Sequence, residues 1–385
     1  MQNYDFDLLV IGGGSGGVRA SRMAAAQGVK VAVVEEAPLG GTCVNLGCIP
    51  KKLYSYASSF PSHYSSAVGY GWEAVNPSFN WETLKANRAT EITRLNGVYK
   101  NLLDGSGVQL IDGRGALVDA HTVQVGEQQY TAKYILIATG GWPVIPDVEG
   151  KELAISSNEI FDLPEFPKRL VVVGGGYIAS EFASIFNGLG SQVTQLYRSE
   201  QILRGFDQDI RNFLAQDIIK AGVDIRTNSD VAKLAKTASG IEVTLKDGST
   251  LEVDQVLYAT GRAPNVKGLG LEALNIAQQK NGAIVVDEDY RTNVESVYAL
   301  GDVTDRVQLT PVALGEAMVL VDHLFGEGKR EMSYDYIPTA IFTTPNAATV
   351  GLTEDEAREQ YKDIVIYRSE FRALKHTLTG KNERT

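Results

Sequence analysis

Two cysteines lie five residues apart in the stretch Gly40–Lys52, which reads GGTCVNLGCIPKK. Five residues of regular helix advance about 7.5 Å along the axis, whereas a disulfide tolerates only about 7 Å between its α-carbons. If Cys43 and Cys48 bond, their segment must be irregular, and Gly47 has the backbone freedom for this. A small strained ring is easily reduced, which suits a disulfide that opens in every turnover.

The surroundings of the cysteines favour a reactive pair. Lys51 lies three residues beyond Cys48, and its positive charge would favour thiolate over thiol. In a reducing compartment so rare a pair is more often catalytic or metal-binding than structural, and two thiolates alone make a poor zinc site. The alternative is two buried thiols used as small hydrophobic side chains, but the apolar surroundings that such thiols favour are missing between Thr42 and Lys52.

The composition sets the class of protein. The chain has 385 residues, a formal net charge of −11 and 44% hydrophobic residues, which excludes disorder and predicts two or three domains that fold without disulfide staples. The sequence contains no run of eighteen apolar residues and no signal peptide at its amino terminus. An acidic balance without basic runs argues against nucleic acid and membrane as partners. We expect a soluble, cytoplasmic protein.

A glycine-rich turn lies between a predicted strand and a predicted helix near the amino terminus. The strand Phe6–Val10 leads into Gly12–Gly17, and the helix Val18–Gln27 and the strand Val29–Val34 follow. Glycines let the backbone approach a pyrophosphate, and the helix points its N-terminal amides at it. Glu35 ends the second strand, where a dinucleotide fold places an acid for the ribose hydroxyls. This predicts a site for the adenosine of FAD or NAD, against the alternative of a purely structural turn.

The same pattern recurs 162 residues later. The strand Arg169–Val173 enters the turn Gly174–Ala179, and the helix Ser180–Leu189 and the strand Gln192–Leu196 follow. The repeat predicts two dinucleotide sites in one chain.

The second copy lacks the acid at the end of its second strand. Tyr197 fills that position, and Arg198 and Arg204 follow. Guanidinium groups pair with a 2′-phosphate, which an acid would repel, so this site should prefer NADPH. The alternative is that both arginines are solvated loop residues.

Three further strands are predicted, and the first two are expected where the chain crosses between the predicted domains. Tyr134–Gly140 and Val256–Arg262 each end on Ala-Thr-Gly, and Val294–Asp302 reads VESVYALGD. The last of these is expected to resume the first domain after the second has been inserted. Residues 332–385 hold only two or three elements, with strands at Pro338–Phe342 and Ala348–Leu352, so this unit must pack on its neighbours or be incomplete.

Together these motifs resemble the FAD-dependent pyridine nucleotide–disulfide oxidoreductases. The resemblance rests on GGTCVNLGCIPKK, the two glycine turns, the ATG strand ends, GYIASE, ALGD and LTPVA, and the lysine pair after Pro50 is similar to the glutathione reductase branch. It implies an α/β fold of two Rossmann-like dinucleotide-binding domains, the second inserted in the first, plus a partial α+β interface domain. The expected boundaries are 1–141 and 264–331 for the FAD domain, 142–263 for the NADPH domain and 332–385 for the interface domain.

The resemblance also implies an activity, the NADPH-dependent reduction of glutathione disulfide through FAD. Cys48 would lie against the flavin and Cys43 would attack the substrate, while Lys51 would sit near flavin N5 and pair with Glu181. Tyr177 would cover the nicotinamide pocket. The implied catalytic residues are Cys43, Cys48, Lys51, Tyr177 and Glu181. A purely structural role for the Lys51–Glu181 pair is the alternative.

The implied ligand-binding residues fall into three sets. Those for FAD are Gly12, Gly14, Ser15, Gly17, Glu35, Thr42, Lys51, Thr139, Gly140, Asp302 and Thr310. Those for NADPH are Gly174, Gly176, Tyr177, Ile178, Glu181, Arg198, Arg204 and Gly261. Those for glutathione are Arg19, Arg22 and Tyr99, of which Tyr99 has the alternative of an ordinary interdomain aromatic.

Two features depart from the family pattern. Met318 stands where relatives often have an arginine for a glutathione carboxylate, and Arg19 could restore that charge. None of the four histidines is followed by proline, so the family's acid–base His-Pro…Glu motif is missing. We therefore expect a truncated chain that keeps both cofactor sites and the cysteine pair, with an impaired homodimer contact. Trypanothione reductase, thioredoxin reductase and a diaphorase-like flavoprotein without disulfide turnover are the alternatives.

Overall fold

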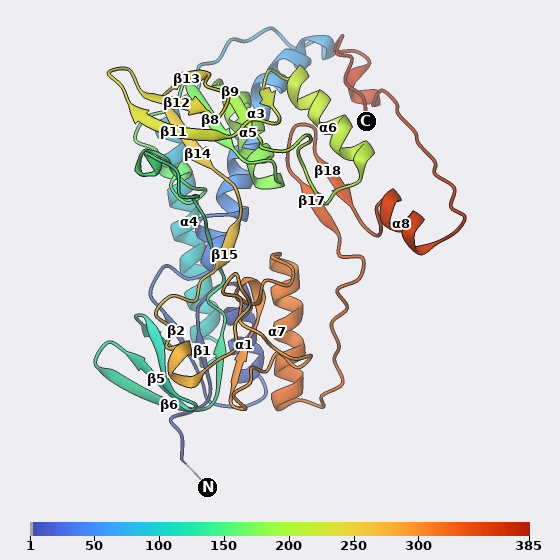
Figure 1. Ribbon diagram of the computed structural model, residues 1–385. Coiled ribbons are helices and arrows are strands. Elements are labelled where there is room, and N and C mark those ends of the chain that lie inside the picture. Colours follow the sequence, from blue (N-terminus) through green and yellow to red (C-terminus); the bar gives the residue numbers. More distant parts are fainter. Residues whose placement is uncertain (1–2) are drawn as a thin grey trace. The chain divides into compact units, whose positions relative to one another are not determined.

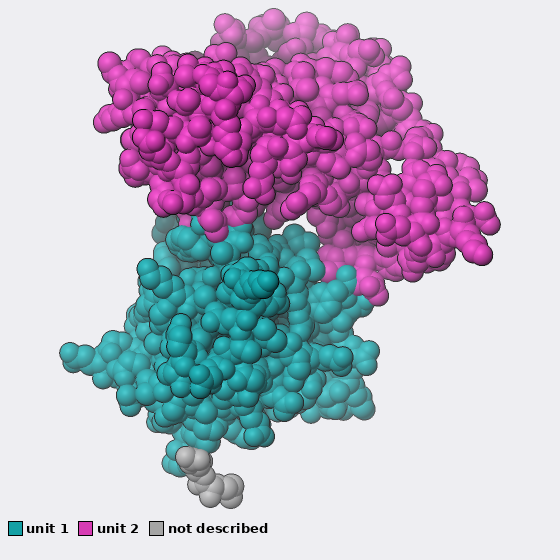
Figure 2. Space-filling model, in the orientation of Figure 1, with its two compact units in different colours: residues 1–50, 88–143, 262–334 teal, residues 51–87, 144–261, 335–385 magenta. Residues whose placement is uncertain are grey.

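The computed structural model describes residues 3–385, which form two compact units (Figures 1 and 2). The first unit contains the chain up to Pro50, Arg88–Pro143 and Arg262–Tyr334. The second unit contains Lys51–Asn87, Val144–Gly261 and Asp335–Thr385. Each unit carries one of the two glycine turns.

The first unit is built on a seven-stranded sheet with the strand order β3-β2-β1-β6-β5-β4, and β16 pairs with β6 on a branch. Its parallel part comprises β1 (Phe6–Ile11), β2 (Val31–Glu35), β3 (Gln109–Asp112), β6 (Gln128–Ile137) and β16 (Val297–Ala299). Its antiparallel part adds β4 (Gly115–Asp119) and β5 (Thr122–Val125). Leu8, Leu9 and Val10 of β1 are buried, as expected of a parallel strand covered on both faces.

Helices α1 (Ser15–Ala25) and α7 (Thr310–Phe325) lie side by side in the first unit (Figure 1). A β-carbon on Gly17 would come within 1.9 Å of the Gly12 carbonyl oxygen, and one on Gly16 within 2.4 Å of the Leu300 side chain. The glycine turn can therefore close only because these positions lack side chains.

The second unit contains a four-stranded parallel sheet with the order β10-β9-β8-β14 and a separate three-stranded antiparallel sheet. The parallel strands are β8 (Arg169–Val173), β9 (Gln192–Leu196), β10 (Asp224–Arg226) and β14 (Gln255–Tyr258). The antiparallel strands are β11 (Val231–Lys236), β12 (Ile241–Leu245) and β13 (Thr250–Val253). Helices α5 (Tyr177–Leu189) and α6 (Gln208–Lys220) pack on the core of this unit.

The remaining elements connect or extend the two sheets. Helix α2 (Gly41–Asn45) and strands β7 (Gly141–Pro143) and β15 (Arg262–Pro264) belong to the first unit, while helix α8 (Glu354–Gln360) and the hairpin of β17 (Thr339–Ile341) and β18 (Ala347–Thr349) belong to the second. Helices α3 (Cys48–Ala67) and α4 (Trp81–Asp104) each contribute residues to both units.

The fold class expected from the sequence is confirmed, because both glycine turns join a parallel strand to a helix and residues 144–261 interrupt the first unit. The predicted domain boundaries remain a prediction. The compact units differ from them mainly in two ways. Residues 51–87 pack in the second unit, where Tyr54 and Trp81 share a hydrophobic core with Phe161 and Phe182, and residues 335–385 belong to that same unit instead of forming a third one.

Candidate functional site

The first glycine turn and Glu35 form one connected structure. Gly12 has a left-handed φ of 111°, and the Gly13 amide donates a hydrogen bond of 2.6 Å to Glu35 Oε2. Burial raises the pKa of Glu35, against the effect of the Gly13 and Ala37 amides. No side chain caps α1 at Gly14, so its first amides stay available for an anion. Ser15 and Gly17 lie in the first turn of α1, and these residues fit the diphosphate and ribose of FAD.

The cysteine segment folds as two helices with a break between them. Helix α2 carries Thr42 and Cys43 and ends at Asn45, and α3 begins at Cys48. A β-carbon on Gly47 would approach the Thr42 carbonyl oxygen to 2.9 Å, so only glycine fits at the break. The irregular segment expected from the five-residue spacing is therefore present. Both cysteines are free thiols here, with Cys43 half-buried and Cys48 exposed.

The two thiols have different environments. The hydrogen bond with Cys48, burial and the charge of Cys48 raise the pKa of Cys43, although the Thr310 hydroxyl opposes this. Cys48 is the first residue of α3, where the helix dipole favours an anion, and its Sγ lies 3.7 Å from Thr310 Oγ1. When the pair loses one proton, the negative charge is therefore stabilised better on Cys48 than on Cys43.

A buried carboxylate lies near this segment. Asp302 is in the 3₁₀ turn Gly301–Thr304, and burial raises its pKa while Arg262 opposes the rise. Apart from its own backbone amide, no group within residues 3–385 donates a hydrogen bond to the Asp302 carboxylate. Arg262 donates to Thr42 Oγ1 at 3.3 Å and to the Gly141 carbonyl oxygen. An ionised carboxylate in such a place needs hydrogen-bond donors, and hydroxyl groups of the flavin side chain fit that need.

The other FAD residues expected from the sequence surround the same end of the sheet. Thr139 and Gly140 follow β6, and the Thr139 hydroxyl donates a hydrogen bond of 2.8 Å to the Asn265 carbonyl oxygen. Thr310 begins α7, and no side chain caps that N-terminus. Its free amides and dipole are suited to an electron-rich ring.

Of the three residues expected to bind substrate, Tyr99 is electrostatically linked to the cysteines and to Arg19. Burial raises the pKa of Tyr99 on α4, the charges of Cys43 and Cys48 add to the rise, and Arg19 opposes it. Arg22 lies one turn further along α1 and donates to Ser106 Oγ at 3.4 Å. Tyr99 therefore lies within electrostatic range of both the cysteine pair and Arg19.

The second unit holds the second glycine turn and the two arginines. Gly174 has a φ of 146°, no side chain caps α5 at Gly176, and a β-carbon on Gly175 would come within 2.4 Å of the Tyr197 ring. The ring thus covers the turn where an acid would otherwise stand. Gly261, which follows β14, has a φ of 137°. Within the described part of the chain, neither Arg198 nor Arg204 has a hydrogen bond or an ion pair, so both guanidinium groups are available for a phosphate.

The first turn of α3 and the middle of α5 are joined by a buried ion pair in the second unit. Lys51 Nζ lies 3.0 Å from Glu181 Oε2, and the two side chains are 13% and 3% exposed. Burial raises the pKa of Glu181, and the charge of Lys51 is the largest opposing influence. Tyr177 and Ile178 begin α5 and pack partly buried on the core of the unit. The pairing of Lys51 with Glu181 expected from the family resemblance is therefore present.

A second buried carboxylate anchors the turn that carries Asp302. Glu316 on α7 is 1% exposed, and its Oε2 accepts a hydrogen bond of 2.6 Å from the Gly301 amide. Its Oε1 accepts one of 2.7 Å from the Tyr334 hydroxyl, whose oxygen lies 3.2 Å from that of Tyr290.

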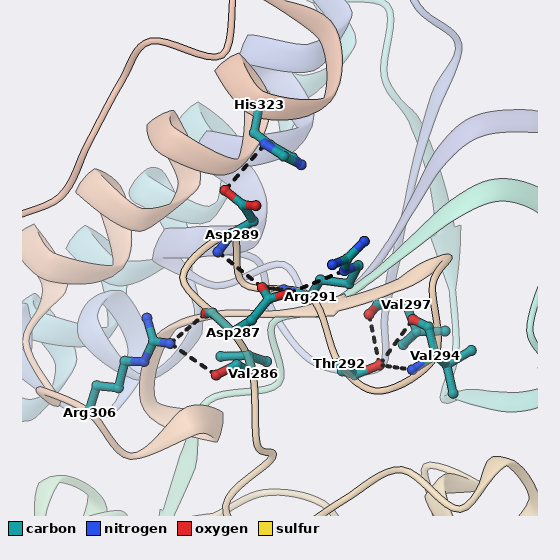
Figure 3. Close-up of polar contacts among 9 residues, drawn as sticks. All are labelled: Val286, Asp287, Asp289, Arg291, Thr292, Val294, Val297, Arg306 and His323. Atoms are coloured by element: carbon teal, nitrogen blue, oxygen red, sulfur yellow. Dashed lines mark hydrogen bonds and ion pairs between the residues drawn. The ribbon is translucent and has the colours of Figure 1, made fainter.

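The loop that carries Tyr290 is itself tied to its neighbours (Figure 3). Asp289 pairs with His323 of α7 at 3.3 Å, and Arg306 donates to the carbonyl oxygen of Asp287 at 2.7 Å. Glu316 of α7 thus holds the turn at Asp302, and the loop that carries Tyr290 is tied to α7 through Asp289 and His323.

Replacement of Glu316 by glutamine is expected to change how stability depends on pH. Burial raises the pKa of Glu316 above its usual 4.5, so the folded state keeps this proton to a higher pH than the unfolded state does. The contribution of this proton to the free energy of unfolding is full below pH 4.5, and it is lost as the pH rises through the pKa of Glu316 in the folded state. The free energy of unfolding of Glu316→Gln should therefore increase relative to wild type as pH rises above 4.5.

Urea unfolding at a series of pH values measures this difference. The exposed Glu359→Gln serves as the control for loss of one negative charge. A relative decrease for Glu316→Gln over the same pH range would show that its hydrogen bonds outweigh its burial.

Sequence reasoning missed three residues that the structure places at these sites: Arg262, Glu316 and Phe342. Arg262 directly follows the second Ala-Thr-Gly, and Phe342 ends a predicted strand, so each adjoins a recognised pattern. Glu316 had the signal of an acid inside an otherwise apolar helix.

Within residues 3–385, no helix is long and apolar enough to cross a membrane. The same residues contain no group of three or more His, Cys, Asp or Glu side chains that could hold a metal ion.

Comparison with known proteins identifies the family. The family model for pyridine nucleotide-disulphide oxidoreductase matches residues 6–317, and the model for the dimerisation domain of that family matches residues 337–385. The chain is 47% identical over 384 residues to a glutathione reductase of Burkholderia cepacia, covering 100% of this chain and 86% of that protein. It is 46% identical over 395 residues to a glutathione reductase of Nostoc sp., covering 99% and 86%.

A solved structure agrees. The HOCl-induced flavoprotein disulfide reductase RclA from Escherichia coli superposes with a TM-score of 0.84 at 30% identity, over 92% of this chain and 79% of that one. The two glycine turns, the paired cysteines and these similarities lead to one conclusion: the chain belongs to the pyridine nucleotide–disulphide oxidoreductase family.

Proposed function

We propose that this protein reduces glutathione disulfide with NADPH, through FAD and the cysteine pair. In the overall reaction, NADPH, one proton and glutathione disulfide give NADP⁺ and two molecules of glutathione. The observation that carries the proposal is the Cys43–Cys48 pair at the break between α2 and α3, with Thr310 of α7 beside Cys48. The relatives named glutathione reductase support the choice of substrate.

FAD would be held by the first unit, and it would supply the chemistry of accepting a hydride from NADPH and passing two electrons to a disulfide. The glycine turn and Glu35 would take its diphosphate and ribose, Asp302 its ribityl hydroxyls, and the N-terminus of α7 the pyrimidine end of the ring. Lys51, from α3, is assigned to the ring as well. Arg262 would keep Asp302 ionised by its charge.

The cysteines divide the work of disulfide exchange. When the Cys43–Cys48 bond is reduced, Cys48 takes the thiolate charge because the start of α3 stabilises it, and Cys43 keeps its proton. After losing that proton, Cys43 attacks one sulfur of the substrate, forms a mixed disulfide and releases the first glutathione thiol. Cys48 then attacks Cys43, which restores the internal disulfide and releases the second glutathione as its thiolate.

NADPH would bind the second unit. The amides at the start of α5 would face its diphosphate, and Arg198 and Arg204 would bind its 2′-phosphate. Tyr177, the first residue of α5, would cover the nicotinamide pocket, and Glu181 would hold Lys51 in position through their ion pair.

Arg19, Arg22 and Tyr99 are proposed to bind glutathione. Arg19 supports this assignment through its electrostatic link to Tyr99, since it can supply the positive charge that Met318 lacks. We further propose a homodimer, supported by the match to the dimerisation domain. The cytoplasmic location remains a prediction from composition and cysteine usage.

An anaerobic titration with NADPH tests the proposed function. We expect a long-wavelength absorbance band to appear after two electrons, because the Cys48 thiolate would then lie against the flavin, and glutathione disulfide should remove it. Complete bleaching of the flavin without this band would show a diaphorase-like flavoprotein instead. Faster turnover with trypanothione disulfide or thioredoxin would identify a different substrate class.

A further inference from the structure

The hairpin of β17 and β18 brings one residue of the dimerisation segment to the Lys51–Glu181 pair. Phe342 directly follows β17, and its backbone amide donates a hydrogen bond of 2.8 Å to Glu181 Oε1. Ile341, the last residue of β17, is fully buried in the same hydrophobic core as Phe182. The burial of Ile341 therefore fixes the end of β17, and with it Phe342, beside Glu181.

The ring of Phe342 contacts both lysines. Lys51 Nζ lies 4.2 Å from the ring centroid and Lys52 Nζ lies 4.0 Å from it. Lys52 Nζ also lies 4.8 Å from the centroid of Tyr56. Both distances to Phe342 are within the range of a cation–π interaction, which holds each ammonium group near the ring.

The contacts around Glu181 share its charge among three groups. Its Oε2 pairs with Lys51 and its Oε1 accepts from Phe342, so both oxygens have partners although the side chain is only 3% exposed. Burial raises the pKa of Glu181, while Lys51, the Phe342 amide and Lys52 lower it. Burial and the charge of Lys51 lower the pKa of Lys52. The Glu181 carboxylate thus lies near two ammonium groups, those of Lys51 and Lys52. The ring of Phe342 adds a stabilising contact for Lys52, which has no ion pair with Glu181.

We propose that Phe342 is a positioning residue for the Lys51–Glu181 pair, with its amide orienting the carboxylate and its ring orienting Lys51. The dimerisation segment would then contribute to the reduction of the flavin by NADPH as well as to assembly. The inference rests on the proposed function, in which Lys51 lies near the flavin.

Two substitutions separate the ring from the amide. Phe342→Leu keeps the amide and an apolar side chain but removes the ring, and Phe342→Pro removes the amide donor. For Phe342→Leu, rapid mixing of the holoenzyme with NADPH should show flavin reduction slowed by about three- to thirty-fold, the range that loss of a partly to largely desolvated cation–π contact gives. The FAD content should remain that of the wild type.

The pH profile of flavin reduction provides a second readout. Loss of the amide donor in Phe342→Pro removes one influence that favours ionised Glu181, so its pKa should rise further and the acid limb of the profile should move to higher pH. Phe342→Leu, which keeps the donor, should leave the acid limb near that of the wild type. If Phe342→Pro does not fold, the rate of flavin reduction in Phe342→Leu remains the test of the inference.

A matched control and a double-mutant comparison complete the design. Phe371→Leu makes the same change at an exposed site of the same segment and should reduce at the wild-type rate. If Phe342 acts through Lys51, Phe342→Leu should have no further effect in a Lys51→Met background. Equal slowing in both backgrounds, or a wild-type rate for Phe342→Leu alone, would overturn the inference. If the wild type itself shows no flavin reduction by NADPH, the proposed function fails instead.

Discussion

Replacement of Cys43 by serine should abolish the reduction of glutathione disulfide, with turnover lowered about a thousandfold or more, because no nucleophile remains to form the mixed disulfide. Reduction of the flavin by NADPH should continue, since Cys43 does not take part in it. Steady-state turnover with glutathione disulfide and rapid mixing with NADPH measure the two effects separately.

The companion substitution distinguishes the roles of the two cysteines. In Cys43→Ser, Cys48 cannot form the internal disulfide, so its thiolate should give the long-wavelength band before any NADPH is added. Cys48→Ser should lack this band in every redox state, while turnover is lost as well. A band in Cys48→Ser and none in Cys43→Ser would reverse the assignment of the two sulfurs. Full turnover in Cys43→Ser would contradict disulfide chemistry at this pair altogether.

Removal of the two arginines beside the second glycine turn should change the choice of nucleotide. A hydrogen bond between charged groups contributes about 1.5–3 kcal/mol, so Arg198→Ala or Arg204→Ala should each raise the KM for NADPH by roughly ten- to a hundredfold. The KM for NADH, which has no 2′-phosphate, should change little. Initial-rate kinetics with both nucleotides give the ratio directly.

The control for this prediction is another exposed arginine of the same unit. Arg358→Ala removes a guanidinium that pairs with Glu354 on α8, and it should leave both KM values unchanged. Equal losses with NADPH and NADH in Arg198→Ala and Arg204→Ala would show that the arginines support the loop and do not select the phosphate. Increasing salt should weaken NADPH binding in the wild type more than in the double variant.

The sequence predicted those features of the fold that depend on the local conformation of the backbone. The strand Arg169–Val173 has the boundaries expected from its apolar run, and both glycine turns join strand to helix as their spacing predicted. The break at Gly47 followed from the distance that a disulfide spans. These features depend on residues within a few positions of each other, where side-chain volume and backbone freedom decide the conformation.

Contacts between distant residues required the fold. The amide of Phe342 reaches Glu181 across 161 residues. Glu316 stands out as an acid in a largely apolar helix, but only the fold shows that it accepts a hydrogen bond from the amide of Gly301. Residues 51–67 continue the helix that Cys48 begins, yet the whole segment 51–87 packs in the second unit because Tyr54 and Trp81 bury their rings there.

The sequence by itself therefore determined the groups on which the proposed chemistry depends: the cysteine pair, the two glycine turns, and the arginines that follow Tyr197 at the position of the missing acid. The tertiary structure decided what surrounds each charge. Burial raises the pKa of Glu181, Glu316 and Asp302, and groups elsewhere in the chain oppose each rise. The reason is physical: the type of a residue decides whether it can carry a charge, but only the packing around it decides the free energy of burying that charge.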